Sequence, residues 1–107
     1  MICLIYLIAS SFTNGSSNNT SVTGAEDLAK CLTEKGAKLY GASWCPHCQN
    51  QKALFGDAVE SLPYVECTEK AQECAQAGIT AYPTWIIDGQ SYSGGKTFAE
   101  LKSYSGC

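Results

Sequence analysis

Helical periodicity alternates with short apolar runs from residue 24 to the end of the chain. Apolar residues three or four positions apart predict helices over residues 24–36, 46–62, 69–77 and 97–104. Compact runs of β-branched, aromatic or small residues predict strands over residues 37–42, 64–67, 84–87 and 90–93. The resulting order is α-β-α-β-α-β-β-α, which is typical of an α/β sandwich.

Local signals mark the ends of several of these segments. Capping-box patterns that begin at Thr23 and Thr97 predict the starts of the first and last helices. The dipeptide Asp88-Gly89 between the last two strands is favoured in two-residue hairpin turns. The helices that separate the first strand from the second, and the second from the third, imply parallel crossovers, and the last two strands form an antiparallel hairpin. We therefore expect a mixed sheet of about four strands in a three-layer α/β/α sandwich.

The N-terminal part of the chain has a different character. Residues 1–11 are mostly a continuous apolar run, too short to span a bilayer, which needs about 20 residues. We interpret them as a signal peptide without its usual positive start, or as the end of a transmembrane helix; a buried strand is the alternative. Residues 12–23 are rich in Ser, Thr and Asn and predict a flexible linker. Both leader interpretations place the domain of residues 24–107 outside the cytoplasm: periplasmic, secreted or tethered facing outward.

Charge and cysteine content narrow the function. The chain has seven lysines, no arginine and ten acidic residues, for a net charge of −3. The chain has no arginine to bind phosphate groups through two parallel hydrogen bonds, and its net charge is negative. We therefore expect no nucleic-acid partner. Seven cysteines among 107 residues is an abnormal density. Such a density indicates disulfides, metal binding or redox chemistry.

The motif Cys45-Pro46-His47-Cys48 lies where a predicted strand meets the 46–62 helix. The unpaired N–H groups of a helix start favour a thiolate on Cys45, and Pro46 suits the first helical turn. Cys48 comes within disulfide reach on the core-facing side, so we expect an exposed attacking sulfur on Cys45 and a shielded resolving sulfur on Cys48. His47 adds a donor or a cation beside Cys45. The motif therefore predicts a redox-active disulfide that needs no other cofactor.

The same motif allows other interpretations. A zinc site needs four ligands, whereas His47 is the single histidine and no second Cys-x-x-Cys pair exists, so we expect no metal. A purely structural disulfide stays open. A Cys/His protease pair is excluded because nearly adjacent residues at a helix start cannot adopt nucleophile–base geometry.

Trp44-Cys-Pro-His-Cys48 between a strand and a helix, followed by Tyr82-Pro-Thr84 before a hairpin, resembles the thioredoxin superfamily. More narrowly, several segments are similar to the thioredoxin-like domain attached to bacterial vitamin K epoxide reductase homologues: 40–48, 51–56, 62–67, 78–79, 82–85 and 92–94. The similarity covers about residues 24–106. The Cys-Pro-His-Cys motif alone is shared with periplasmic disulfide oxidases of the DsbA type.

The resemblance implies a thioredoxin-like fold and a role in oxidative protein folding. The chain would be a thiol–disulfide oxidoreductase, acting as an oxidase or as an electron-transfer partner between secreted proteins and a quinone-linked membrane reductase. Cys45 would be the nucleophile, Cys48 the resolving thiol, and Pro83 a cis proline beside which substrate backbone docks. The other side chains that we expect at the substrate flank these positions: Trp44, Tyr82 and Thr84. Packing in the core is the alternative for the aromatic residues.

Two departures from the family pattern bear on this interpretation. Leu39 falls where thioredoxins carry a buried acid that assists proton transfer, which weakens the case for reductase chemistry. No membrane bundle accompanies the domain, which implies a free-standing relative or a detached C-terminal piece. A reductase or isomerase of the same fold and a client-binding module without turnover stay open. We expect protein thiols and a vitamin K epoxide reductase-like membrane protein as partners, and a monomer.

Four further cysteines follow residue 24. The spacing of Cys67 and Cys74 suits a local disulfide, and the resemblance implies the same pair; two buried thiols are the alternative. Cys31 and Cys107 could join the first helix to the C-terminus. We place the first and last helices on opposite faces of the sheet, which favours Cys31 as a core thiol and Cys107 as an exposed one.

Overall fold

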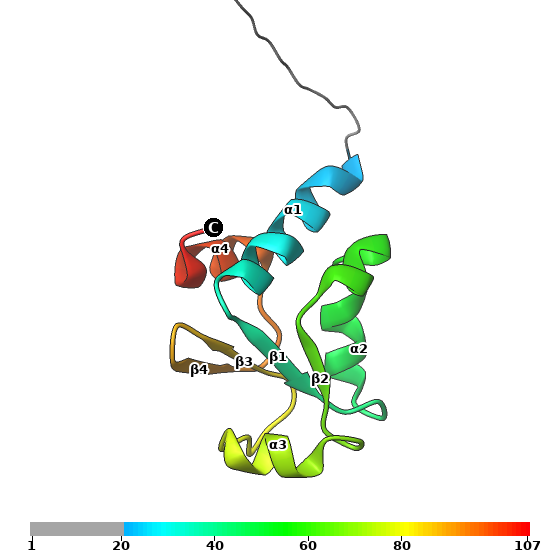
Figure 1. Cartoon of the computed structure of the whole chain (residues 1–107). Coiled ribbons are helices and arrows are strands. Elements are labelled where there is room, and N and C mark those ends of the chain that lie inside the picture. The colour runs from blue at the N-terminus through cyan, green and yellow to red at the C-terminus, as the bar shows by residue number, and fades with distance from the viewer. Residues whose placement is uncertain (1–20) are drawn as a thin grey trace, which may run out of the picture.

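The computed structural model of the chain describes residues 21–107 (Figure 1). The predicted leader and most of the predicted linker lie outside these residues. The helices are α1 (Ser21–Glu34), α2 (Pro46–Ala53), the 3₁₀ helix η1 (Gly56–Ser61), α3 (Ala71–Gln76) and α4 (Phe98–Ser105). The strands are β1 (Lys38–Gly41), β2 (Tyr64–Glu66), β3 (Thr84–Ile87) and β4 (Gln90–Ser93). Within this part of the chain, every helix is too short or too polar to cross a bilayer.

The four strands form one mixed sheet in the order β2-β1-β3-β4. β1 runs parallel to β2 and antiparallel to β3, and β3 and β4 form an antiparallel hairpin. At the hairpin turn Asp88 and Gly89 both have positive φ, 53° and 78°. Two consecutive positive φ angles match the twist of the flanking strands, which is why this dipeptide favours the turn. The mixed four-stranded sheet confirms the prediction of the sheet type. The expected parallel crossover into β3 is wrong, because β3 runs antiparallel to β1 and therefore opposite to β2.

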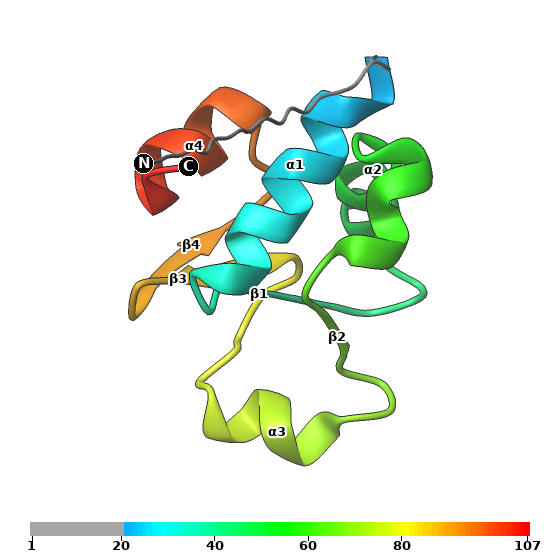
Figure 2. The ribbon, with the colours of Figure 1, turned by 45° about the horizontal axis from the view of Figure 1, so that its top comes forward.

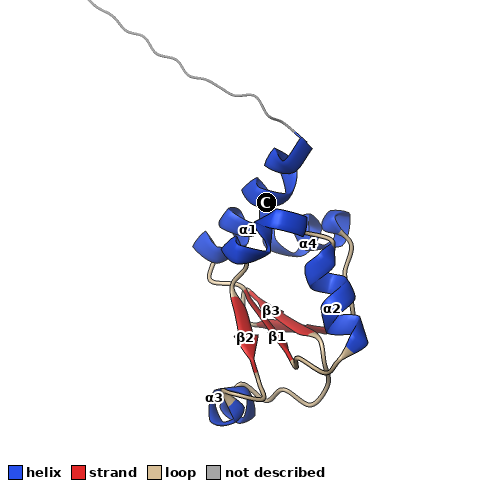
Figure 3. Ribbon diagram, turned by 90° about the vertical axis from the view of Figure 1, so that its right-hand side faces the viewer, coloured by secondary structure: helices blue, strands red, loops and turns tan. Residues whose placement is uncertain are grey.

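Helices cover both faces of the sheet, as predicted. Leu39 and Trp85 face the larger core, to which α1, η1 and α4 contribute apolar side chains. Their strand neighbours Tyr40 and Ile86 face the other way and pack with residues around α3. Figure 3 shows the strands between α3 and the remaining helices.

The predicted helix over residues 46–62 is divided. α2 ends at Ala53, and η1 begins at Gly56, whose φ of +55° lies in the left-handed region and interrupts the α-helix. Phe55, Ala58 and Leu62 still face the core on both sides of the interruption. The apolar period therefore continues across a change of helix type, and the pattern alone does not reveal the break.

The expected placement of the first helix is wrong. Figure 2 shows α1 lying between α4 and α2 over the same face of the sheet. Leu28 and Leu32 of α1 share one core with Leu101 of α4, and the Thr33 hydroxyl donates to the Ser61 carbonyl of η1 at 3.1 Å. This shared face explains the disulfide between Cys31 and Cys107, whose Cα atoms are 6.1 Å apart.

Candidate functional site

The cysteine motif begins α2, as the spacing predicted. Cys45 is the N-cap residue, with extended backbone angles of φ −86° and ψ 117°, and Pro46 occupies the first turn. The Cys48 backbone N–H donates to Sγ of Cys45 at 3.3 Å. Both cysteines are free thiols in this structure. The sulfur of Cys45 thus replaces the hydroxyl or carboxylate oxygen that usually accepts this N-cap hydrogen bond.

The expected exposure of Cys45 is wrong, because both motif cysteines are buried: Cys45 is 4% exposed and Cys48 is 0% exposed. Tyr82 packs against the small cluster that they form with Ala42. Trp44 meets the edge of the Tyr82 ring with 5.8 Å between the centroids. The two aromatic residues come from segments far apart in the sequence. Tyr82 shields the Cys45 side of the motif from solvent.

Pro83 lies beside the redox pair. The Tyr82–Pro83 peptide bond is cis, as the resemblance implied. The Cys45 thiol donates a weak hydrogen bond to the Tyr82 carbonyl, with 3.8 Å between sulfur and oxygen. The structure therefore brings together three elements of the predicted site: both motif cysteines and the segment that carries this proline.

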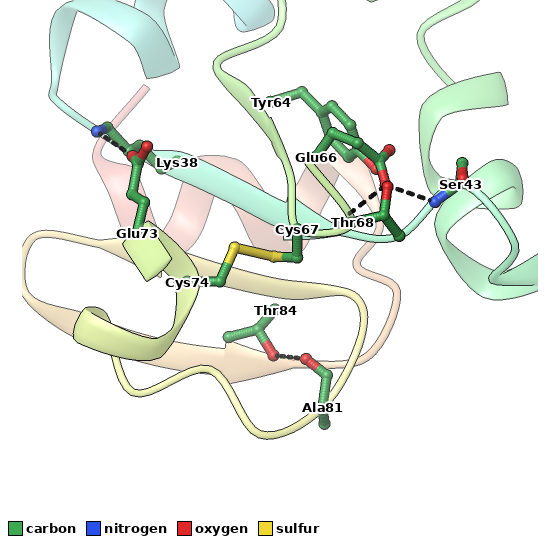
Figure 4. Close-up of a disulfide and its surroundings, with 10 residues drawn as sticks. All are labelled: Lys38, Ser43, Tyr64, Glu66, Cys67, Thr68, Glu73, Cys74, Ala81 and Thr84. Carbon is green, nitrogen blue, oxygen red and sulfur yellow. Dashed lines mark hydrogen bonds and ion pairs between the residues drawn. A yellow bond between two sulfur atoms is a disulfide. The ribbon is translucent and has the colours of Figure 1, made fainter. Parts of the chain in front are cut away.

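Thr84 lies differently from the sequence expectation. It is 5% exposed, and its hydroxyl donates to the Ala81 carbonyl at 2.7 Å (Figure 4). The Thr84 side chain thus closes the turn that leads into β3 and offers no surface to a substrate. Trp44, in contrast, is 66% exposed and remains the most accessible apolar group next to the motif.

His47 lies on the surface of the molecule. It is exposed on α2 and lines a cavity of about 230 Å³ with Leu54 and with Lys96 and its neighbours. Among residues 21–107, no hydrogen bond joins His47 to Cys45. The stabilisation of a Cys45 thiolate by His47 stays a prediction.

The resolving thiol is strongly disfavoured as a thiolate. Burial raises the pKa of Cys48 from 9.0 to about 11, and its hydrogen bond with Cys45 acts in the same direction. The positive charge of Lys52, one helical turn further along α2, partly opposes this shift. At neutral pH the reduced site therefore carries a proton on Cys48.

Gln51 is a site residue that the sequence analysis missed. Its side chain is 1% exposed, and its Oε1 accepts hydrogen bonds from the Trp85 indole N–H at 3.1 Å and from the Lys96 backbone N–H at 2.6 Å. Its Nε2 donates to the Lys96 carbonyl at 3.0 Å. Gln51 therefore anchors α2, which carries the motif, to β3 and to the loop before α4. Its position three residues after Cys48, on the same side of the helix, was the available signal.

Glu66 is a second residue that the sequence analysis missed. Its carboxylate accepts hydrogen bonds from the Ser43 backbone N–H at 2.8 Å, the Thr68 hydroxyl at 2.7 Å and the Tyr64 hydroxyl at 2.8 Å (Figure 4). Although partial burial works against the charge, these bonds hold the pKa of Glu66 below its usual value. Residues two apart on a strand share a face, so the pair Tyr64 and Glu66 could have been inferred from β2.

The remaining predicted sulfur pair is bonded. Cys67, directly after β2, and Cys74, in α3, form a disulfide with 5.8 Å between their Cα atoms (Figure 4). The same figure shows the ion pair of Lys38 and Glu73, 3.3 Å apart, which also connects β1 to α3. In residues 21–107, no cluster of three or more His, Cys, Asp or Glu side chains could hold a metal ion.

Comparisons with known proteins agree with this architecture. The Thioredoxin family model matches residues 36–105. The thiol-disulfide oxidoreductase LTO1 of Arabidopsis thaliana is 46% identical over 88 residues, which cover 74% of this chain. Those residues are 23% of the length of LTO1, so the chain spans about a quarter of that relative.

Two solved structures are similar to this chain. A poplar thioredoxin h superposes with a TM-score of 0.51 at 21% identity, covering 78% of this chain and 86% of its own. A Fasciola hepatica thioredoxin gives a TM-score of 0.46 at 25% identity, covering 74% and 88% of the two chains. Since the family model matches more than half of its length, the chain belongs to the thioredoxin family.

Proposed function

We propose that this chain is a thiol–disulfide oxidoreductase that exchanges the Cys45–Cys48 disulfide with the thiols of protein substrates. One observation carries the proposal: two free thiols at a helix start, joined through the 3.3 Å hydrogen bond to Cys45 Sγ, beside the Tyr82 carbonyl at 3.8 Å. The name of the Arabidopsis relative, thiol-disulfide oxidoreductase LTO1, supports the same reaction class.

The reaction divides the work between the two sulfurs. A substrate thiolate attacks Sγ of Cys45 in the oxidised site, the Cys45–Cys48 bond breaks, and its electron pair moves to Sγ of Cys48, which takes up a proton. A second substrate thiolate attacks the substrate sulfur of the mixed disulfide, which forms the substrate disulfide and releases Cys45. Each cycle moves two electrons from the substrate to the chain.

The substrate docks on the exposed side of the motif. Trp44, 66% exposed, and half-buried Tyr82 form an apolar platform, and the backbone around Pro83 lies beside it. Aromatic side chains of this kind provide large contact areas at low entropic cost. Extended substrate backbone then runs past the Cys45 sulfur.

We place this reaction outside the cytoplasm, in the oxidising direction, with a vitamin K epoxide reductase-like membrane protein as electron acceptor. The direction and the partner rest on the sequence resemblance described above. The two structural disulfides, Cys31–Cys107 and Cys67–Cys74, support an oxidising compartment.

Trapping and a redox titration test the proposal. Oxidised wild type should convert a reduced two-cysteine peptide into the peptide disulfide. The variant Cys48→Ala, when offered the oxidised peptide, should accumulate a mixed disulfide at Cys45. Cys45→Ser should do neither. Glutathione equilibration then gives the potential: about −120 to −180 mV supports an oxidase, and roughly −270 mV indicates a reductase. The absence of any mixed disulfide in Cys48→Ala contradicts the reaction itself.

A further inference from the structure

We propose that Tyr64 and Glu66 form the proton pathway of the buried resolving thiol, with Tyr64 as the group that exchanges a proton with Cys48. This inference rests on the proposed function, because it concerns the protonation of Cys48 during disulfide exchange. Neither residue belongs to the cysteine motif, and both lie on β2, which pairs with β1 directly behind the motif.

The buried position of Cys48 creates the need for such a pathway. Cys48 is 0% exposed, so bulk water does not reach its sulfur. The thiol is protonated at neutral pH, because burial raises the pKa of Cys48 to about 11. One proton must therefore leave this sulfur each time the disulfide forms, and one must return each time it breaks.

Gly41 brings the phenol and the sulfur to the same space. A Cβ atom placed on Gly41 would lie 2.9 Å from Sγ of Cys48 and 3.1 Å from the hydroxyl oxygen of Tyr64. Both atoms thus border the space that a side chain at Gly41 would fill. The glycine at the end of β1 makes this approach of the two groups sterically feasible.

A hydrogen bond continues the pathway from the phenol to the surface. The Tyr64 hydroxyl donates to Oε1 of Glu66 at 2.8 Å, and the Glu66 carboxylate is half-buried, next to the exposed Ser43 and Thr68. In the proposed pathway, the Tyr64 hydroxyl is thus the single group between the space beside Cys48 and a water-accessible carboxylate.

Leu39, the neighbour of Tyr64 on β1, has no group that could carry a proton. Leu39 pairs with Tyr64 across the β1–β2 ladder and is 0% exposed, so this point of the sheet holds no acid. The titratable groups of the described chain that face Cys48 are Cys45, Lys52 and Tyr64. Cys45 becomes the disulfide partner, which leaves the phenol as the neutral proton carrier.

Lys52 positions the phenol. Its Nζ lies 4.2 Å from the centroid of the Tyr64 ring, within the range of a cation–π contact. The contact ties the ring of Tyr64 to α2, the helix that also carries Cys48. Lys52 is thus a positioning residue, and its positive charge also lowers the pKa of Cys48, which favours the thiolate.

The proton moves in step with the sulfur chemistry. When Cys48 resolves a mixed disulfide, its S–H proton passes to the Tyr64 oxygen while the Tyr64 proton passes to Glu66. Sγ of Cys48 bonds to Sγ of Cys45, the bond from Cys45 to the partner sulfur breaks, and the partner leaves as a thiolate. Glu66 then releases its proton to water. The reverse sequence protonates Cys48 when a substrate opens the disulfide.

A two-phase reaction with Ellman's reagent tests this assignment on the full chain in a Cys3→Ser background, in which Cys45 and Cys48 are reduced and the other four cysteines are disulfide-bonded. Excess reagent makes the first release of coloured thiolate, by attack of Cys45, faster than the second, by attack of Cys48. In Tyr64→Phe the second phase slows about tenfold or more at neutral pH, while the first is unchanged. Tyr92→Phe, whose ring stacks on Tyr104 far from the motif, changes neither phase.

The pH profile separates proton transfer from a structural effect. The deficit of Tyr64→Phe shrinks as the pH approaches about 11, where Cys48 ionises without help. A deficit of constant size at every pH, or an unchanged second phase, overturns the assignment. Glu66→Gln, which keeps an acceptor for its hydrogen bonds, slows the second phase in the same way, whereas Glu69→Gln does not.

The two proposals fail in different ways. If wild type releases no second thiolate, Cys45 and Cys48 form no disulfide, and the proposed function fails. If wild type shows both phases and both Tyr64→Phe and Glu66→Gln keep its second-phase rate, the proton pathway alone fails.

Discussion

The indole N–H of Trp85 donates to Oε1 of Gln51 at 3.1 Å, and both side chains are essentially buried. This contact joins the helix of the cysteine motif to the central strand β3. Gln51 is a polar side chain within an apolar core. Its loss would leave two N–H donors, those of Trp85 and Lys96, without a partner.

We therefore expect Gln51→Leu to lower the free energy of unfolding by about 2–4 kcal/mol, because a buried donor without a partner costs about 1–3 kcal/mol. Urea denaturation of the oxidised chain measures the loss. Gln72→Leu, at an exposed position of α3, is the matched control and stays within about 0.5 kcal/mol of wild type. Equal stability of the two variants would show that the Gln51 network is energetically neutral.

Removal of the two structural disulfides should have unequal effects. Cys31 and Cys107 are 76 residues apart, whereas Cys67 and Cys74 are 7 apart. Loop-closure entropy assigns about 4.5 kcal/mol to the long loop and about 2.5 kcal/mol to the short one. Paired Cys→Ser variants, compared by guanidinium denaturation with Cys45 and Cys48 joined as a disulfide, should follow that order. The opposite order would mean that packing losses around buried Cys67 and Cys74 exceed the entropy difference.

Reduction of the motif should make stability depend on alkaline pH. The Cys48 pKa is raised to about 11 in the folded chain, so between pH 9 and 11 the unfolded chain ionises this thiol while the folded chain keeps it protonated. Stability therefore falls across this window, by roughly 2–3 kcal/mol in total, since one pKa unit corresponds to about 1.4 kcal/mol. Denaturation at stepped pH measures the fall. Reduced Cys48→Ala should lose this component, and a profile identical to wild type would contradict the shifted pKa.

A methyl group at Gly41 should displace the Cys48 sulfur or the adjacent strand. The Cβ of Gly41→Ala would meet Sγ of Cys48 at 2.9 Å, which forces the sulfur or β1 to shift. We expect a loss of about 1–3 kcal/mol in unfolding free energy, together with slower resolution by Cys48. Gly24→Ala is the control of opposite sign: its Cβ meets nothing within 4 Å, and alanine stabilises a helix by about 0.5–1 kcal/mol relative to glycine.

Loss of the Trp44 ring should affect protein substrates selectively. Because Trp44 is 66% exposed, Trp44→Ala leaves the fold intact, and reduction of the motif by dithiothreitol should proceed at the wild-type rate. The KM for a two-cysteine peptide should rise about tenfold through loss of the apolar platform. An equal slowing with dithiothreitol and with the peptide would instead place Trp44 in the sulfur chemistry.

Local signals in the sequence predicted local structure well. Thr97 caps α4 through its hydroxyl, which accepts from the Glu100 backbone N–H at 3.1 Å, while the Glu100 carboxylate accepts from the Thr97 N–H at 2.9 Å. The hairpin turn at Asp88 formed as the dipeptide predicted. In both cases the determining atoms lie within a few residues of one another. The first helix is an exception, because it begins at Ser21, before the predicted cap at Thr23.

Features that depend on distant parts of the chain were not predictable in this way. The cover over Cys45 comes from Tyr82, 37 positions away in the sequence. The apolar stripe of α1 indicates that the helix is buried but not which face of the sheet it covers, so the pairing of Cys31 was misjudged. Likewise, the position of Tyr64 behind Cys48 follows from the parallel register of β1 and β2, in which Gly41 lies opposite Glu66.

The disulfide between Cys31 and Cys107 turns most of the domain into a covalent ring. The whole sheet, α2 and the Cys45–Cys48 pair lie inside this ring. After a single proteolytic cut between the two bonded cysteines, the pieces therefore stay joined as one molecule, whose mass changes only by the added water. The fragments separate only when the disulfide is reduced. A nicked chain can thus keep both halves of its redox site together.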